Sequence, residues 1–479
     1  MEYWKNDMNY YELREQITEK LGYSFLHNRL VDHRRHQRAV EEKGRKSEYK
    51  EFKLDQPGEA IPQERLLNTE EIQSFIEISC RAAACPMPLN IDTWDGMLCP
   101  FGCSYCFANA FRATLYTAFF DNSKTMGFRH CNPKMYKTEL EKLFELRGNN
   151  PHDVKGDVAK AIAMEIPIRF GIRFEDFLKE EGDEKIALEL LEFLKDQEYP
   201  TMINSKSALL GREDYVRALA DNKAGTAVHI TLISSNNEVL ELLEPGAPSY
   251  KERLKAMKIM SDAGIRVIAR IEPFLPFICD QEEDVRKYMV DVWDVGVRNI
   301  TFDTYSYTAK NQGIRQAFIN NGFDWDRIFH IGCESQGFGS ILLGKFMEMF
   351  RTFGFSCSTF DMGNAPDNDD NVCCEVGDIF KEYGFNYGCT VYAARMIAKR
   401  GKKNKPTSWL HFKNWVDKKG GFLSESLERE VHELWNCQGN QAYSHYWAKG
   451  LEPCGYDKYG IIWNSGQYDF REELLECLK

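Results

Sequence analysis

One segment, residues 89–112, carries the most informative pattern in this sequence: LNIDTWDGMLCPFGCSYCFANAFR. It contains Cys99, Cys103 and Cys106 in a C-x3-C-x2-C spacing, within a loop that also holds Pro100 and Gly102. Thiolates this close in sequence can converge on one soft-metal centre. A structural zinc site needs four ligands, whereas a cubane cluster held by three cysteines keeps one iron open to a small molecule. The alternatives are half of a zinc site or three buried core cysteines.

Composition describes an ordinary globular enzyme. The 479 residues are 43% hydrophobic and 28% charged, and they suggest two or three domains or one barrel with appended segments. The sequence contains neither a run of 18 apolar residues nor an apolar signal-peptide core. We therefore expect no membrane span, reduced thiols and a cytoplasmic location. The net charge of -12 weighs against a polynucleotide partner.

Strand-like and helix-like segments alternate after residue 89. We predict strands at 89–94, 166–171, 201–207, 227–235, 266–276 and 298–305, with helices between them. This repetition predicts an α/β fold, a partial (β/α)6 TIM-like barrel with its site at the carboxyl ends of the strands. An N-terminal helical segment would span residues 1–85, the barrel residues 86–310, and a cysteine-rich, aromatic C-terminal capping region residues 311–479. We also predict a helix over residues 69–84.

The three-cysteine spacing, followed by the aromatic Phe107, resembles the signature of the radical S-adenosylmethionine (SAM) enzymes. The resemblance implies that Cys99, Cys103 and Cys106 hold a 4Fe-4S cluster whose open iron binds the amino and carboxylate groups of SAM. It also implies that SAM-binding residues follow the strands, and the candidates are Glu175, Asp176, Ser205, Lys206, Ser234 and Arg253. The alternative for each candidate is that it is a polar residue at the end of a strand and does not bind SAM.

Three further segments resemble the radical SAM branch that includes spore photoproduct lyase. They are SKSALLGREDYVRAL, LEPGAPSYKERL and IEPFLP. That lyase returns a hydrogen from a cysteine near the end of its second strand, but the corresponding segment here, RFGIRFED, has no cysteine. DNA repair is therefore a poor expectation for this chain.

The acidic charge and the aromatic tail favour a small flat substrate. The candidate substrate contacts include Glu272 and Asp303, because a carboxylate can accept two adjacent N–H groups in bidentate fashion. Trp94, near the cysteine loop, is a further candidate that would either contact the substrate or merely pack. The overall make-up resembles enzymes that split queuine, a deazapurine base, and release preQ1. A reductant such as flavodoxin or ferredoxin would supply the electron. A radical SAM enzyme acting on nucleic acid and a non-enzymatic iron–sulfur or zinc protein remain the alternatives.

The C-terminal third contains a second group of cysteines. Five fall within 60 residues: Cys333, Cys357, Cys373, Cys374 and Cys389. They would hold zinc or a second iron–sulfur cluster, or they are core or substrate-facing residues, since their spacing matches no common zinc ribbon. The tryptophans after residue 406 would belong to helices that cap the barrel mouth.

Overall fold

The computed structural model describes residues 9–21, 79–80, 87–96, 99–106, 108, 128–276, 278–304, 338–359, 374–380, 390–418, 423, 425–438 and 451–466. None of the helices in these ranges combines the length and the apolar character needed to cross a bilayer. The basic run 27–46, Cys333, Cys373 and Cys389 lie outside the described residues.

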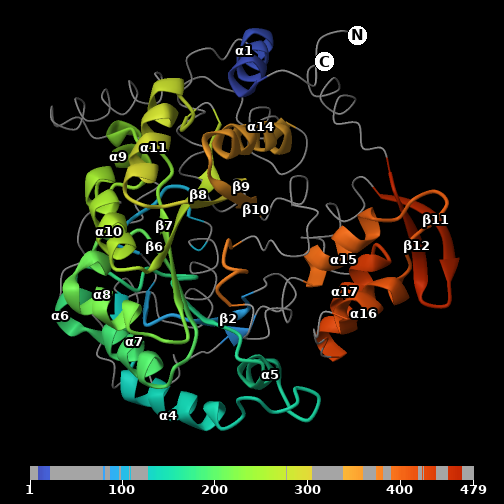
Figure 1. The fold of residues 1–479 in the computed structure, drawn as a ribbon, viewed down its shortest axis with the longest axis horizontal. Helices are drawn as coiled ribbons and strands as arrows, with labels where there is room; N and C mark the ends of the chain where they lie inside the picture. Colours follow the sequence, from blue (N-terminus) through green and yellow to red (C-terminus); the bar gives the residue numbers. More distant parts are fainter. Residues whose placement is uncertain are drawn as a thin grey trace, which may run out of the picture.

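A parallel sheet forms the centre of the molecule (Figure 1). Its strands run in the order β2 (Leu89–Ile91), β5 (Ile168–Phe170), β6 (Thr201–Ser205), β7 (Thr226–Thr231), β8 (Arg266–Phe274), β9 (Asn299–Thr304) and β10 (Ser356–Thr359). Every neighbouring pair in this series is parallel. The first six strands correspond to the six predicted ones, so the partial-barrel prediction is confirmed.

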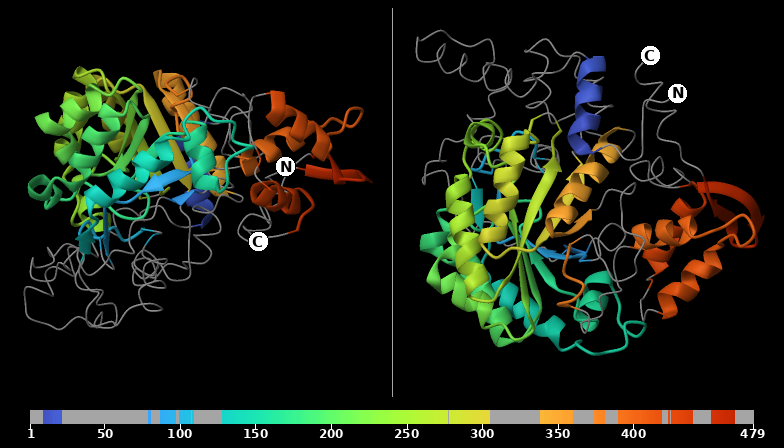
Figure 2. Two further views of the ribbon diagram at one scale, coloured as in Figure 1. Left: turned by 90° about the horizontal axis from the view of Figure 1, so that it is seen from below. Right: turned by 45° about the horizontal axis from the view of Figure 1, so that its top comes forward.

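Helices pack against the outer face of this sheet in Figures 1 and 2. They are α4 (Pro133–Phe144), α5 (Asp157–Ala163), α6 (Glu181–Glu184), α7 (Ile186–Asp196), α8 (Glu213–Ala220), α9 (Asn237–Leu243), α10 (Tyr250–Asp262) and α11 (Glu282–Asp294), with a 3-10 turn at Leu209–Gly211. Capping residues in the sequence fix where two of these helices begin. Ser249 and Glu252 form a capping box at α10, and the Asn236 side chain caps α9.

The two faces of the sheet bury different side chains, because successive residues of a strand point to opposite faces. Outward residues such as Ile203, Val228 and Ile230 join the large core under the helices. At the amino-terminal end of the inner face lies a second, smaller apolar cluster, formed by Met202, Ala227 and Ile268 with Met87, Cys374, Val376 and Phe380. Residues 374–380 therefore close the amino-terminal end of the barrel.

The sheet continues beyond residue 310, which the sequence analysis did not predict. Strand β10 pairs with β9 in parallel, and α14 (Phe338–Phe353) packs on both strands. At the other edge, β1 (Ser79–Cys80) pairs antiparallel with β2. The helix predicted over residues 69–84 is wrong at these two positions, because pairing with the free edge of β2 overrides local helix preference. The domain boundaries at 85 and 310 stay predictions.

The termini add two smaller parts. Helix α1 (Tyr10–Leu21) is pinned to the loop after β8, where the Asp280 carboxylate accepts from the Tyr10 hydroxyl and from Arg14 Nε at 2.8 Å. Near the other end, α15 (Thr390–Lys399), α16 (Trp409–Lys418), α17 (Glu425–Trp435) and the hairpin of β11 (Leu451–Asp457) and β12 (Gly460–Ser465) lie to one side of the sheet (Figure 2). Trp409, Trp435 and Trp463 are buried there. That this part caps the barrel mouth stays a prediction.

Candidate functional site

The three-cysteine loop follows β2 and the short strand β3 (Trp94–Gly96), which pairs with β4 (Phe128–His130). Its backbone makes two tight turns, with hydrogen bonds from Gly102 N to the Cys99 carbonyl (3.0 Å) and from Cys106 N to the Cys103 carbonyl (3.1 Å). Gly102 has a φ of 56°, a conformation that glycine adopts without strain. These turns hold the three thiols on one short loop at the carboxyl ends of the strands.

The loop packs directly on the segment LEPGAP, residues 243–248. Ser104 N donates to the Leu243 carbonyl at 2.9 Å, and Gly246 N donates to the Phe101 carbonyl at 3.1 Å. A Cβ atom at Gly246 would lie 2.1 Å from the Pro100 carbonyl oxygen. The close approach of the two backbones therefore requires glycine at position 246.

A buried polar network fastens the same loop to the sheet. The Tyr105 hydroxyl donates to Glu244 Oε1, and Arg253 Nη2 lies 2.5 Å from Glu244 Oε2. Arg253 also donates from Nε to the Pro248 carbonyl (2.8 Å) and from Nη1 to the Thr231 carbonyl at the end of β7 (2.9 Å). Both side chains of the ion pair have no exposed surface. Arg253 is thus committed to protein partners, and its predicted contact with SAM stays a prediction.

Lys206 brings a positive charge to the cysteine loop from the end of β6. Its Nζ lies 5.4 Å from the centroid of the Tyr105 ring. Burial lowers the pKa of Lys206, but the neighbouring Cys103 and Glu244 raise it, and the net direction is upward. For Cys103, burial raises the pKa of the thiol while Lys206 lowers it. The ammonium group therefore stays charged beside the thiols and can pair with an anionic group bound there.

Glu175 ties the loop after β5 to the end of β6. Its Oε1 accepts from the Ser205 hydroxyl (2.6 Å) and from Phe177 N (3.1 Å), and its Oε2 accepts from Lys206 N (3.0 Å). Burial raises its pKa, although these hydrogen bonds lower it. The carboxylate thus orients the backbone that carries Lys206.

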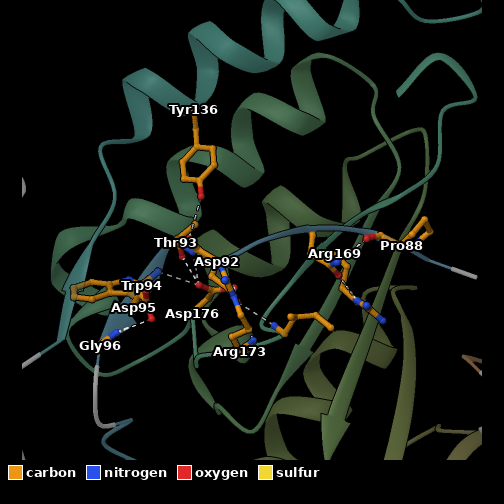
Figure 3. Close-up of polar contacts among 12 residues, drawn as sticks. Pro88, Asp92, Thr93, Trp94, Asp95, Gly96, Tyr136, Arg169, Arg173 and Asp176 are labelled. Atoms are coloured by element: carbon orange, nitrogen blue, oxygen red, sulfur yellow. Dashed lines mark hydrogen bonds and ion pairs between the residues drawn. The ribbon is translucent and has the colours of Figure 1, made fainter. Parts of the chain in front are cut away.

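Asp176 holds the backbone that leads into the cysteine loop (Figure 3). Its Oδ1 accepts from Thr93 N (2.5 Å), Thr93 Oγ1 (2.8 Å) and Trp94 N (3.1 Å). Its Oδ2 has no hydrogen-bond partner among the described residues. Burial, and then the nearby Asp92, raise the pKa of Asp176 well above its ordinary value. This carboxyl group therefore loses its proton at a higher pH than an exposed aspartate does.

Asp92 anchors the turn after β5 in the same view (Figure 3). Its Oδ1 accepts from the backbone N of Ile172 and of Arg173, both at 3.1 Å, and its Oδ2 accepts from Arg173 Nε at 2.8 Å. The turn begins at Gly171, where a Cβ atom would lie 2.0 Å from the Asn204 carbonyl oxygen. The ends of β2, β5 and β6 are therefore fixed to one another.

The donor set fits an iron–sulfur cluster and SAM. Three thiols share one anchored loop, and a charged lysine faces them. Within the described ranges no three or more His, Cys, Asp or Glu side chains gather closely enough to hold a single ion.

Two other candidates at this end have protein partners. Ser234 Oγ accepts from Asn236 N at 3.1 Å. Trp94 is fully buried, and its indole Nε1 donates to Glu181 Oε2 at 2.8 Å. Packing is thus the interpretation that the position of Trp94 favours over substrate contact.

The described cysteines of the C-terminal group lie apart from the loop. Cys357 is buried in β10, and its Sγ is 3.8 Å from the Phe355 carbonyl oxygen. Cys374 belongs to the small apolar cluster, and its own carbonyl oxygen lies 2.8 Å from His229 Nε2. The second metal stays a prediction that involves residues outside the described ranges.

The inner face of the sheet carries the predicted residues Glu272 and Asp303 together with His229 and Arg270, which the sequence analysis passed over. Glu272 forms an ion pair with Arg270 on β8. Burial lowers the pKa of His229 on β7, the charge of Arg270 lowers it further, and the charge of Glu272 raises it. Burial lowers the pKa of Arg270, whereas the negative charges of Glu272 and of Asp303 on β9 raise it. Strict alternation within AVHIT and RVIARIE would have identified His229 and Arg270 as facing the same side.

Comparison with known proteins finds a family match for the central region. Residues 96–289 match the family model described as the radical SAM superfamily. Uncharacterised proteins of Mycobacterium tuberculosis (strain ATCC 25618 / H37Rv) and Mycobacterium bovis are each 20% identical over 236 residues, which is 48% of this chain. The chain spans 64% of the length of these relatives.

Two solved structures match part of this chain at low sequence identity. Spore photoproduct lyase, complexed with dinucleoside spore photoproduct, matches with a TM-score of 0.43 and 14% identity, over 60% of this chain and 79% of that protein. SuiB of Streptococcus suis matches with a TM-score of 0.35 and 10% identity, over 60% of this chain and 54% of that protein.

Proposed function

Because the chain carries a radical SAM domain, whose family uses a 4Fe-4S cluster and SAM, we propose that it abstracts hydrogen from a small flat substrate. The substrate would bind on the inner face of the sheet, below the cysteine loop. The observation that carries this proposal is the cysteine loop itself, packed on Gly246 and faced by Lys206 at the carboxyl edge of a parallel sheet.

Each residue of the loop region has a distinct task in this proposal. Cys99, Cys103 and Cys106 hold the cluster, and Lys206 pairs with the carboxylate of SAM. The bound cluster and SAM supply a 5′-deoxyadenosyl radical when one electron arrives from flavodoxin, ferredoxin or a chemical reductant. The protein provides orientation and excludes water.

The SAM amino group needs acceptors, and the loop after β5 offers two carboxylates. Glu175 and Asp176 are both buried there, close to the ends of β5 and β6. Asp176 keeps one oxygen without a partner among the described residues, so its ionised form can accept one further N–H. Ser205 and Ser234 would complete the surroundings of SAM at the next two strand ends.

The best candidate substrate is queuine, cleaved to preQ1 as a step of base salvage. This would make the enzyme a lyase that breaks the carbon–nitrogen bond between the aminomethyl arm and the cyclopentenediol. The net charge of -12 suits a free base better than a polynucleotide. Glu272 and Asp303 on the inner face would accept its N–H groups.

A second candidate is a radical SAM enzyme that acts on nucleic acid. The segments SKSALLGREDYVRAL and LEPGAPSYKERL, which resemble the spore photoproduct lyase branch, favour it. A salt-dependent affinity for tRNA or DNA would support this candidate, and its absence at low salt would count against it.

The test is an anaerobic assay of the reconstituted full-length protein with dithionite, SAM and queuine, with products identified by mass spectrometry. Formation of 5′-deoxyadenosine together with preQ1 would support both parts of the proposal. Formation of 5′-deoxyadenosine while queuine persists would leave the radical SAM part standing and reject the substrate.

A matched pair of cysteine variants tests the ligand assignment. Cys103→Ser should lose bound iron and SAM cleavage, whereas Cys437→Ser, at an exposed cysteine after α17, should retain both. Equal iron content in the two variants would reject Cys103 as a cluster ligand.

A further inference from the structure

The inner face of strands β6, β7 and β8 is built in layers. The lowest, apolar part is Met202, Ala227 and Ile268, and residues 374–380 cover it. The next inward positions are Asn204 and His229, which pair in register with each other and lie level with Ile268 of β8. Arg270 pairs with Thr231, one inward step nearer the carboxyl edge, and Glu272 follows Arg270 on β8. These inward polar residues form a polar layer. Two residues of strand span roughly 6–7 Å, so the polar layer lies just below the proposed SAM site.

His229 presents an unused acceptor in this layer. The ring is 1% exposed, and its Nε2 lies 2.8 Å from the Cys374 carbonyl oxygen. A carbonyl only accepts, so Nε2 carries the hydrogen and Nδ1 is a bare acceptor. Nδ1 has no hydrogen-bond partner among the described residues. Burial and the charge of Arg270 lower the pKa of His229 to about 4, so the ring is neutral at pH 7.

Arg270 and Glu272 stand beside it on one strand with opposite hydrogen-bonding character. They form an ion pair through Arg270 Nη2 and Glu272 Oε2, and their side chains keep 23% and 20% exposure. Outside this ion pair, Arg270 has further N–H donors and Glu272 has a second oxygen that accepts, so donors lie next to acceptors on β8. His229 and Arg270 lie on neighbouring strands one inward step apart, because His229 pairs with Ile268 and Thr231 pairs with Arg270.

The chemistry of these three groups matches a particular ligand edge. Arg270 offers donors, whereas Glu272 and His229 Nδ1 offer acceptors. A 2-amino lactam, the edge of guanine-type bases, presents a carbonyl acceptor, a ring N–H donor and an exocyclic amine donor in a row. An adenine-type edge presents a different order and lacks the carbonyl.

We propose that His229, Arg270 and Glu272 form a recognition site for a planar base with a 2-amino lactam edge. Arg270 donates to the carbonyl, Glu272 accepts from the ring N–H, and Glu272 and His229 Nδ1 share the two hydrogens of the exocyclic amine. This inference rests on the proposed function, because it deepens the description of the same site. The closed amino-terminal end makes the carboxyl edge the way in, so the bound base lies next to SAM.

The first experiment needs no variant. Anaerobically reconstituted full-length protein with SAM is titrated calorimetrically with preQ1 and with 7-deazaadenine. We expect preQ1 to bind at least about tenfold more tightly, because a site built to hydrogen-bond one edge rejects an edge that leaves its groups unpaired. Equal affinity for the two bases would overturn the inference.

The second experiment assigns the preference to residues. Glu272→Gln removes the negative charge and one acceptor, and it should weaken preQ1 binding about tenfold or more while SAM affinity and iron content stay unchanged. His229→Phe keeps a ring but removes Nδ1, and it should reduce the preference for preQ1 over 7-deazaadenine. Glu213→Gln, at an exposed residue that begins α8, is the matched control and should change nothing.

The outcomes separate this inference from the proposed function. Unchanged preQ1 affinity in Glu272→Gln would overturn the inference, even if His229→Phe proves too unstable to measure. No binding of either base by a protein that still cleaves SAM would overturn the inference and the small-base substrate, but not the radical SAM activity. Loss of preQ1 preference in Glu272→Gln, with normal SAM cleavage, would support the inference.

Discussion

The cysteine loop and the inner face of β7 and β8 are both buried and polar, but their hydrogen bonding differs. Around the loop, Tyr105 donates to Glu244, and Arg253 donates to two backbone carbonyls and forms a buried ion pair with Glu244. On the inner face, His229 Nδ1 has no partner among the described residues, and Arg270 and Glu272 keep exposed surface. The difference separates two roles. Saturated polar groups hold a rigid framework, and unsatisfied ones mark where a ligand completes the hydrogen bonding.

The largest expected effect comes from breaking the saturated network at its buried ion pair. Arg253→Met would leave the Glu244 carboxylate buried without its cation, so we expect the free energy of unfolding to fall by about 3–5 kcal/mol. Urea unfolding followed by circular dichroism measures it. Arg286→Met removes a solvent-exposed pair with Glu282 on α11 and serves as the control. If both variants behaved alike, the network would not be the anchor that we describe.

The next effect tests the close contact between the cysteine loop and residues 243–248. Gly246→Ala would place a Cβ atom 2.1 Å from the Pro100 carbonyl oxygen, so the loop must shift. We expect a loss of about 1–3 kcal/mol in unfolding free energy and less iron retained after reconstitution, measured by metal analysis. Gly455→Ala, where the nearest atom is 3.9 Å away, is the matched control. Full iron retention in Gly246→Ala would contradict the anchoring role.

A smaller effect concerns ligand binding rather than stability. Lys206→Gln removes the cation that faces the cysteine loop, and we expect the Kd for SAM to rise about tenfold, or about 1.4 kcal/mol, with unchanged iron content. Equilibrium dialysis with labelled SAM measures it. Lys223→Gln, at an exposed lysine, should bind SAM normally. An unaltered Kd in Lys206→Gln would remove Lys206 from the SAM site.

The smallest expected effect is a change in the pH dependence of stability, which depends on the buried carboxyl group of Asp176. Burial, and then Asp92, raise the folded-state pKa of Asp176 well above the ordinary value of 3.8. Above pH 3.8 the unfolded chain releases this proton while the folded protein keeps it, so rising pH destabilises the wild-type fold until the folded-state pKa is passed. Asp176→Asn, which cannot ionise, should therefore gain stability relative to wild type as the pH rises.

Urea unfolding at pH 5 and pH 8 measures this gain. Asp153→Asn, at an exposed residue, is the control and should track the wild type at both values. A stability difference between Asp176→Asn and wild type that does not change with pH would show that Asp176 ionises normally in the folded protein.

Local patterns explain why much of this molecule was predictable. Six parallel strands and the helices between them follow from hydrophobic runs, caps such as Ser249 and turn residues such as Gly264, which are all local in sequence. The cysteine loop was predictable for the same reason, since three cysteines within eight residues form a local pattern. Strand β10, β1 and the cover made by residues 374–380 were missed, because each depends on pairing or packing with residues more distant in sequence.

The sequence by itself determined the radical SAM resemblance, the partial barrel and the identity of the loop cysteines. Only the tertiary structure decided that Arg253 and Glu244 pair inside the protein and that Trp94 is packed away. It also decided that His229 and Arg270 lie one inward step apart on neighbouring strands of the same inner face. A spacing pattern records which side chains can reach one another along a strand or loop. Burial and the choice of partner depend on residues brought together from distant parts of the chain, and these decide whether a polar group is structural or left for a ligand.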